Sequence, residues 1–123
     1  MSYQTIWTDR GVEWIYHGTV TGKEIIQSNE EIYGDPRFDD LRYQLVDLTQ
    51  VERFEVSDKE MRQMAYLDAA AARTNPRIRL AVIATGESGR SVFDAYAKNI
   101  KNPVWKHELF SSRKNAEDWL GIR

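Results

Sequence analysis

The pattern of apolar and polar positions begins with two strand-like runs, 3–8 and 12–21, joined by a short link that ends in Gly11. A short glycine-containing link between β-rich runs predicts a β-hairpin. Four apolar residues of the second run share a parity, as expected of a strand with one buried face: Val12, Trp14, Tyr16 and Val20.

Helical and strand-like patterns then alternate to the end of the chain. Apolar residues at helical spacing predict helices over 21–33, 57–74, 90–101 and 112–120, and apolar runs predict strands over 43–48, 78–85 and 104–110. The run 78–85 is the most apolar, as expected of a central parallel strand covered on both faces. The order β-β-α-β-α-β-α-β-α predicts an α/β fold: a mixed, mostly parallel sheet of about five strands with four helices.

Composition narrows the class of protein. A chain of 123 residues with 41% hydrophobic and 29% charged residues predicts a single globular domain over 1–123. The net charge of −2 gives no basic field for nucleic acid, and we expect no nucleic-acid partner. The chain has no cysteine and no apolar run long enough to span a membrane. These features predict a cytoplasmic protein.

The element order, together with several short motifs, resembles the SpoIIAA-like family of the STAS superfamily, small α/β domains related to sporulation anti-sigma-factor antagonists. The motifs are Gly18-Thr19-Val20-Thr21 before the first helix, Tyr43 to Leu48, Arg79 to Ile83, and Phe110 with Ala116, Trp119 and Leu120. The resemblance implies a STAS-type fold and a non-enzymatic regulatory module that binds a protein partner. It also implies a phosphorylated serine in the loop after the third strand, 52–58, where Ser57 stands without the Asp-Ser-Ser-Gly signature. Members of this branch are similar in fold to lipid-binding Sec14-type domains, and a small-molecule or lipid-binding module is the alternative.

Asp47 ends an apolar run, where a buried carboxylate needs a partner. One interpretation is that it accepts hydrogen bonds from the backbone amides that follow. The other is that it marks the carboxyl edge of a parallel strand, where open α/β sheets bind ligands. On that interpretation six polar residues form one ligand or partner pocket: Asp47, Thr49, Ser57, Thr85, Ser88 and Arg90.

Ser57 has two interpretations of its own. The spacing of Ser57 and Glu60 predicts a capping box, in which each side chain accepts from the other residue's backbone amide at the helix start. Phosphorylation is the functional alternative, since a helix N-terminus favours a phosphate. The flanking Glu55 and Asp58 oppose added negative charge.

The sequence gives little indication of nucleotide binding, metal binding or catalysis. The turn from Gly86 to Ser91 is too short for a phosphate loop and carries Arg90 where lysine is needed. His17 and His107 lie in separate predicted strands, so we expect no metal site and no cofactor. No nucleophile elbow or cysteine is present, and enzymatic activity is not predicted. Tyr3 and Trp7, in a predicted edge strand, suggest a homodimer.

Overall fold

The computed structural model describes residues 2–122, which form a five-stranded sheet in the order β1-β2-β3-β4-β5. β1 (Tyr3–Trp7) pairs antiparallel with β2 (Gly11–Thr21), and each later pair of neighbours is parallel. The remaining strands are β3 (Tyr43–Glu55), β4 (Arg79–Ile83) and β5 (Lys106–Phe110). The α/β class and the mostly parallel sheet predicted from the sequence are confirmed.

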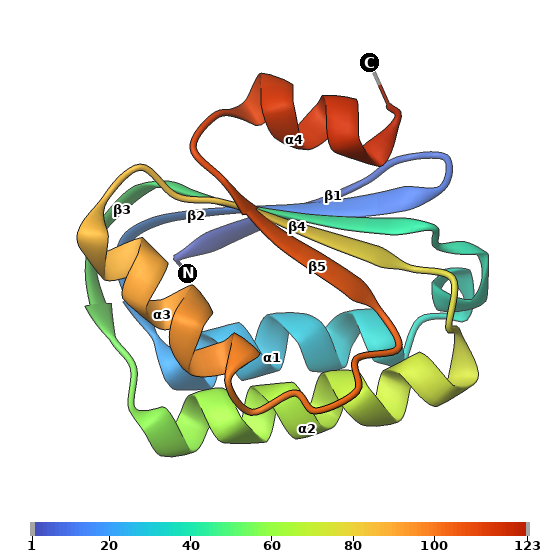
Figure 1. The fold of residues 1–123 in the computed structure, drawn as a ribbon, viewed down its shortest axis with the longest axis horizontal. Helices are drawn as coiled ribbons and strands as arrows, with labels where there is room; N and C mark the ends of the chain where they lie inside the picture. The colour runs from blue at the N-terminus through green and yellow to red at the C-terminus, as the bar shows by residue number, and fades with distance from the viewer. Residues whose placement is uncertain (1, 123) are drawn as a thin grey trace.

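Helices cover both faces of this sheet (Figure 1). The helices α1 (Gly22–Tyr33), α2 (Asp58–Thr74) and α3 (Glu87–Ala97) lie on one face, and α4 (Arg113–Leu120) lies on the other. Consecutive strands are neighbours and parallel crossovers are right-handed, so the three connecting helices come to the same side. The sheet is thus the middle of three layers, with a three-helix layer on one side.

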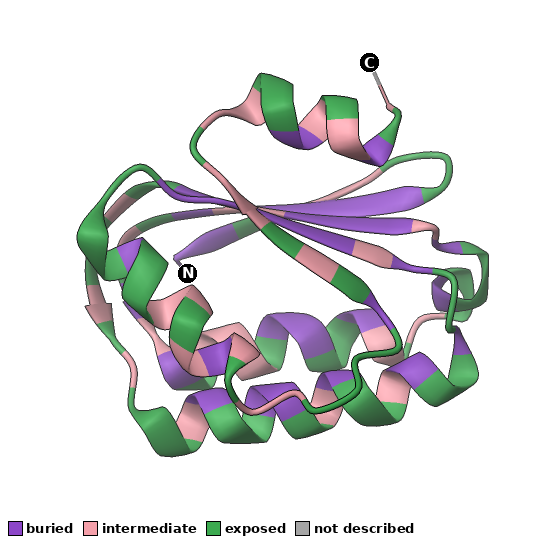
Figure 2. Ribbon diagram, in the orientation of Figure 1, coloured by how far each residue is buried: buried purple, intermediate pink, exposed green. Residues whose placement is uncertain are grey.

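Two apolar cores result, because successive side chains of a strand point to opposite faces. Leu45 of β3 and Ile83 of β4 face α4 and pack with Ala116 and Leu120. Val12, Trp14 and Tyr16, among others, belong to the larger core beneath α1, α2 and α3. Figure 2 shows the buried residues along the sheet and on the inner sides of the helices.

Some predicted boundaries were wrong. β3 runs on to Glu55 rather than ending at Leu48, so the predicted loop 52–58 is largely strand. The extension pairs with the last part of β2 after β4 has ended at Ile83, and only Val51 and Phe54 of its residues pack against the larger core. Its mostly polar sequence therefore gave no strand signal. A short 3-10 helix, η1 (Pro36–Asp40), was not predicted.

The helix-layer ends also differ from the prediction. α3 begins at Glu87, with Gly86 as its N-cap residue, and ends at Ala97, whereas the apolar spacing suggested 90–101. A Cβ at Gly89 would lie 2.8 Å from that of Ala84, so glycine lets the start of α3 approach the end of β4 closely. The strand β5 begins at Lys106 rather than at the predicted position 104.

Gly18, in the irregular part of β2, has a φ of +65°, a conformation that glycine adopts without strain.

Candidate functional site

Asp47 lies within β3 rather than at its end, and its side chain faces α4. Its Oδ1 accepts hydrogen bonds from the Thr49 backbone N–H at 2.9 Å and from the Thr49 hydroxyl at 2.6 Å. Its Oδ2 is 3.1 Å from the Arg113 guanidinium, which also pairs with Glu13 at 3.0 Å. The buried carboxylate is therefore satisfied by a backbone amide, as the first interpretation expected, and also by a hydroxyl and by a cation from α4 that the sequence did not indicate.

Ser57 forms the capping box that its spacing predicted. Its Oγ accepts from the Glu60 backbone N–H at 3.1 Å, and its own N–H donates to Glu60 Oε1 at 2.9 Å. Ser57 is exposed at the start of α2. The helix-starting role is confirmed, whereas phosphorylation stays a prediction.

The other predicted residues lie on the surface at the carboxyl end of the sheet. Thr85 follows β4, and Ser88 and Arg90 are in the first part of α3; all three are exposed, as is Thr49. Asp47 pairs with Arg113 of α4, and the Thr49 hydroxyl binds the same carboxylate. Ser57, Ser88 and Arg90 instead belong to the starts of α2 and α3, which lie on the opposite face of the sheet (Figure 1). Neither of the two cavities described below is lined by any of the six, and their role in binding stays a prediction.

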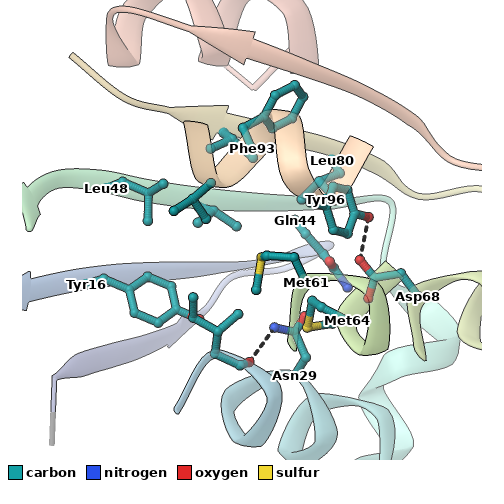
Figure 3. A pocket seen from close by; sticks show the side chains of 14 residues that line it. Tyr16, Asn29, Gln44, Leu48, Met61, Met64, Asp68, Leu80, Phe93 and Tyr96 are labelled. Carbon is teal, nitrogen blue, oxygen red and sulfur yellow. Dashed lines mark hydrogen bonds between the residues drawn. The ribbon is translucent and has the colours of Figure 1, made fainter. Parts of the chain in front are cut away.

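A cavity of about 70 Å³ lies between the sheet and the three-helix layer (Figure 3). We call it the inner cavity. Its wall is mostly apolar and comes from β2, α1, β3, α2, β4 and α3; it includes Tyr16, Ile25, Val46, Leu48, Met61, Leu80 and Phe93. An apolar interior space of this kind is where small ligands bind in many proteins.

One end of the inner cavity is polar, because Asp68 of α2 reaches it. The carboxylate is buried and accepts a hydrogen bond from Tyr33 on Oδ1 and another from Tyr96 on Oδ2, the second at 2.6 Å. Burial raises the pKa of Asp68 to about 6, although the two tyrosine hydrogen bonds act to lower it. Burial and then the Asp68 charge hold the pKa values of Tyr33 and Tyr96 well above 10, so both hydroxyls remain donors.

Gln44 lies beside Asp68 at the same end (Figure 3). Its side chain is fully buried in β3, and neither its Oε1 nor its Nε2 has a hydrogen-bond partner within residues 2–122. The Gln44 amide faces the Tyr33 hydroxyl and acts to lower the pKa of that group, but the two do not meet the geometry of a hydrogen bond. A buried amide without a partner destabilises a fold by about 1–3 kcal/mol, and such a group calls for an explanation.

A second cavity, of about 170 Å³, is also lined by Asp68 and Tyr96. We call it the outer cavity. It lies under the segment that joins α3 to β5, and Arg73, Lys101 and Trp105 contribute to its wall. Asp68 and Tyr96 line both cavities, so the hydrogen bond between them belongs to the wall of each.

Sequence reasoning missed Asp68, although one signal was available. The buried positions of α2 recur at helical spacing and are Met61, Met64, Ala65, Asp68 and Ala72. Asp68 is the charged member of that apolar stripe, and a charge on the core face of a helix indicates a partner or a function. Gln44, inside an apolar strand, carries the same kind of signal.

Within the part of the chain that the structure describes, no helix is long and apolar enough to cross a membrane, and no group of three or more metal-binding side chains comes together.

The comparisons with known proteins were made on sequence and on structure. No protein-family model matches the chain, and no curated protein matches it. The structure of the anti-sigma factor antagonist SpoIIAA in its unphosphorylated form is similar, with a TM-score of 0.61 at 12% identity over 97% of this chain and 97% of that one. The chain has a SpoIIAA-like fold.

Two further structures agree with this SpoIIAA-like fold. The phosphorylated form of SpoIIAA, a Bacillus cell fate determinant, has a TM-score of 0.60 at 12% identity over 96% of this chain and 98% of that one. A DUF3478-family protein with a SpoIIAA-like fold, from Shewanella loihica PV-4, has a TM-score of 0.52 at 14% identity over 96% and 91%. The resemblance stated from the sequence motifs is thus confirmed for the fold.

Proposed function

We propose that the chain is a non-enzymatic, cytoplasmic regulatory module that works by binding another protein. The supporting observation is the similarity, over nearly the full length of both chains, to an anti-sigma factor antagonist. A fold alone does not carry a function. Binding of another protein also requires a contact surface on this chain.

The surface we propose is the carboxyl end of β3 and β4. Ser57, Thr85, Ser88 and Arg90 are exposed there, around the starts of α2 and α3. Asp47 and Thr49 would support it from within β3. Polar and charged side chains on element ends suit a contact that forms and dissociates.

A photo-reactive amino acid at Ser88 tests this surface in the source cell. We expect one protein to crosslink there and, once purified, to bind the wild-type chain but not an Arg90→Glu variant. The control places the same group at Lys114, exposed on α4 at the opposite face. Identical crosslinks from both positions would reject the surface.

Phosphorylation of Ser57 is the switch we propose for this contact. One of the two SpoIIAA structures is of the phosphorylated form. Ser57 is exposed, but a phosphate there would displace Glu60 from the capping box. Ser57→Asp, which can still cap the helix, should change affinity for the crosslinked partner, and equal affinity with Ser57→Asn would dismiss the switch.

The non-enzymatic part of the proposal rests on how Asp68 is held. It has a raised pKa beside a cavity, which is a feature of many catalytic carboxylates. Here, however, each carboxylate oxygen already accepts a tyrosine hydroxyl, and both tyrosines stay protonated. This arrangement suits a binding group rather than a base that must exchange its proton.

A homodimer through β1 is the remaining partner proposal. β1 is an edge strand, which leaves one row of backbone groups available for pairing. Tyr3 is buried against the protein's own interior, and the Arg37 guanidinium lies 3.9 Å from the centre of the Trp7 ring. Backbone pairing, not the two aromatic side chains, would then join the copies. Light scattering that gives a monomer at millimolar concentration would exclude it.

A second function, binding of a small molecule, is favoured by the inner cavity. This space lies between helices and sheet, as a ligand-binding module requires, and its polar end is formed by Gln44 and Asp68 rather than by Asp47. Native mass spectrometry of the protein purified from its own cells should show a bound mass that is released on unfolding. Only the bare protein mass, in preparations that are never denatured, would count against this function.

A further inference from the structure

The inner cavity is amphipathic, with Gln44 and Asp68 at one end of a mostly apolar wall. Leu48 and Tyr16 lie toward the other end (Figure 3). The ligand that complements such a space has one polar group on a short apolar body.

The unpartnered side-chain amide of Gln44 determines which polar group the ligand carries. A glutamine side chain offers two N–H donors and one carbonyl acceptor, and at Gln44 both kinds of atom lack partners among the described residues. The group that complements the Gln44 amide carries a hydrogen-bond acceptor next to a donor. An alcohol or an amine satisfies only part of it, whereas an H–N–C=O group can accept from Nε2 and donate to Oε1.

Asp68 adds a constraint of charge. Its carboxylate oxygens accept the Tyr33 and Tyr96 hydroxyls and retain lone pairs for a further donor. A second anion beside a buried carboxylate is repelled strongly where the dielectric is low. A ligand carboxylate is therefore excluded, and a ligand N–H is favoured.

We propose that the inner cavity binds a small neutral molecule that carries a carboxamide-type H–N–C=O group, held by Gln44 and Asp68, on a short apolar body. This inference rests on the second function proposed above, the binding of a small molecule.

The size of the cavity limits the apolar body. Its volume of about 70 Å³ is roughly half of the 150 Å³ that holds benzene in an engineered protein cavity. The apolar body is therefore limited to a short, flexible alkyl chain, and a ligand with as many non-hydrogen atoms as benzene enters only if the wall adapts. Met61 and Met64 form part of the wall, and methionine side chains adapt readily to a bound group.

Four probes of nearly equal size separate the chemical classes: butyramide, butyrate, butylamine and 2-pentanone. Each is titrated into the wild-type protein at pH 7.5, and binding is followed by NMR chemical shifts of the Gln44 side-chain amide and of the methionine methyl groups. We expect butyramide to bind at least about tenfold more tightly than butyrate and 2-pentanone, a difference equal to about one good hydrogen-bonded contact. We expect it to bind more tightly than butylamine as well, because the ammonium ion must lose its hydration and offers Gln44 Nε2 no acceptor, although it can pair with Asp68.

Gln44→Leu removes the amide and keeps the size of the side chain. We expect it to weaken butyramide at least about tenfold and to leave 2-pentanone nearly unchanged. Gln50→Leu is the matched control, since Gln50 is exposed on the same strand. It should bind butyramide as the wild type does.

The outcomes separate the inference from the function on which it rests. If all four probes bind with similar affinity, the cavity binds ligands without selecting the amide, and the inference is overturned while the second function stands. If no probe shifts these resonances at hundreds of millimolar, water alone satisfies the amide, and both are overturned. Should the leucine variant not fold, the order of the four probes in the wild type still decides.

Discussion

Replacing Asp68 by asparagine should change how the stability of the protein depends on pH. The substitution keeps the shape of the side chain and its place between Tyr33 and Tyr96, but it removes the charge. In the wild type, burial raises the pKa of Asp68 from 3.8 to about 6. The variant has no such group.

The sign of the effect follows from proton binding. Between about pH 3.8 and 6 the folded wild type retains the Asp68 proton, whereas the unfolded chain releases it. The folded state then binds more protons, so the free energy of unfolding falls as the pH rises. The stability contributed by the neutral carboxyl is fully present below about pH 3.8 and is lost above about pH 6.

The raised pKa of Asp68 also gives the size of the change in the free energy of unfolding. One pKa unit corresponds to about 1.36 kcal/mol, so a rise from 3.8 to about 6 amounts to roughly 3 kcal/mol. Glu24 and Asp35 have lowered pKa values, which act in the opposite direction. Both carboxylates are present in wild type and variant, and their effects cancel in the difference between the two proteins.

Urea unfolding, followed by tryptophan fluorescence at several pH values between about 3.5 and 7.5, measures this difference. We expect the stability of the wild type minus that of Asp68→Asn to fall by roughly 3 kcal/mol across the range. Asp94→Asn, an exposed position on α3, is the control and should give a nearly level difference. A level difference for Asp68→Asn would refute the reasoning, because it would mean that burial does not favour the neutral carboxyl.

Three further substitutions test the rest of the structure by urea unfolding. Gln44→Leu should raise the free energy of unfolding by about 1–3 kcal/mol, since it removes a buried amide without partners; Gln50→Leu, on the surface, should change it by less than about 0.5 kcal/mol. Arg113→Ala should lower it by about 2 kcal/mol, because two buried carboxylates lose their charged hydrogen bonds to a partly exposed cation, whereas Lys114→Ala should have an effect below about 1 kcal/mol. Ser57→Ala should lower it by about 1 kcal/mol through loss of the helix cap; no loss would contradict the capping box.

Local patterns in the sequence determined most of the fold. The helical spacing of Met61, Met64 and Ala65 marked α2, and Ser57 with Glu60 marked its start, because these features depend on residues only a few positions apart. The alternation of strands and helices then limited the topology, since crossovers between parallel strands are right-handed. These are properties of single elements and of their order.

Elements held by distant partners were harder to predict. The second half of β3, up to Glu55, is a strand because β2 pairs with it, and its own residues are mostly polar. The end of β4 at Ile83 leaves that extension as part of a two-stranded ribbon. Pairing between backbones has no signature in the side chains of one strand.

The candidate site was decided by tertiary structure alone. Asp68 meets Tyr33 and Tyr96, which are 35 and 28 positions away, and Arg113 reaches Glu13 across 100 positions. The sequence did determine that Asp68 and Gln44 occupy apolar patterns. It could not determine whether partners reach them, because that depends on how α1, α2 and α3 pack together over the sheet. Packing gave the Asp68 carboxylate two hydroxyl donors and left the Gln44 amide facing a cavity, since a side chain's partners are set by the distances between elements and not by its neighbours in the chain.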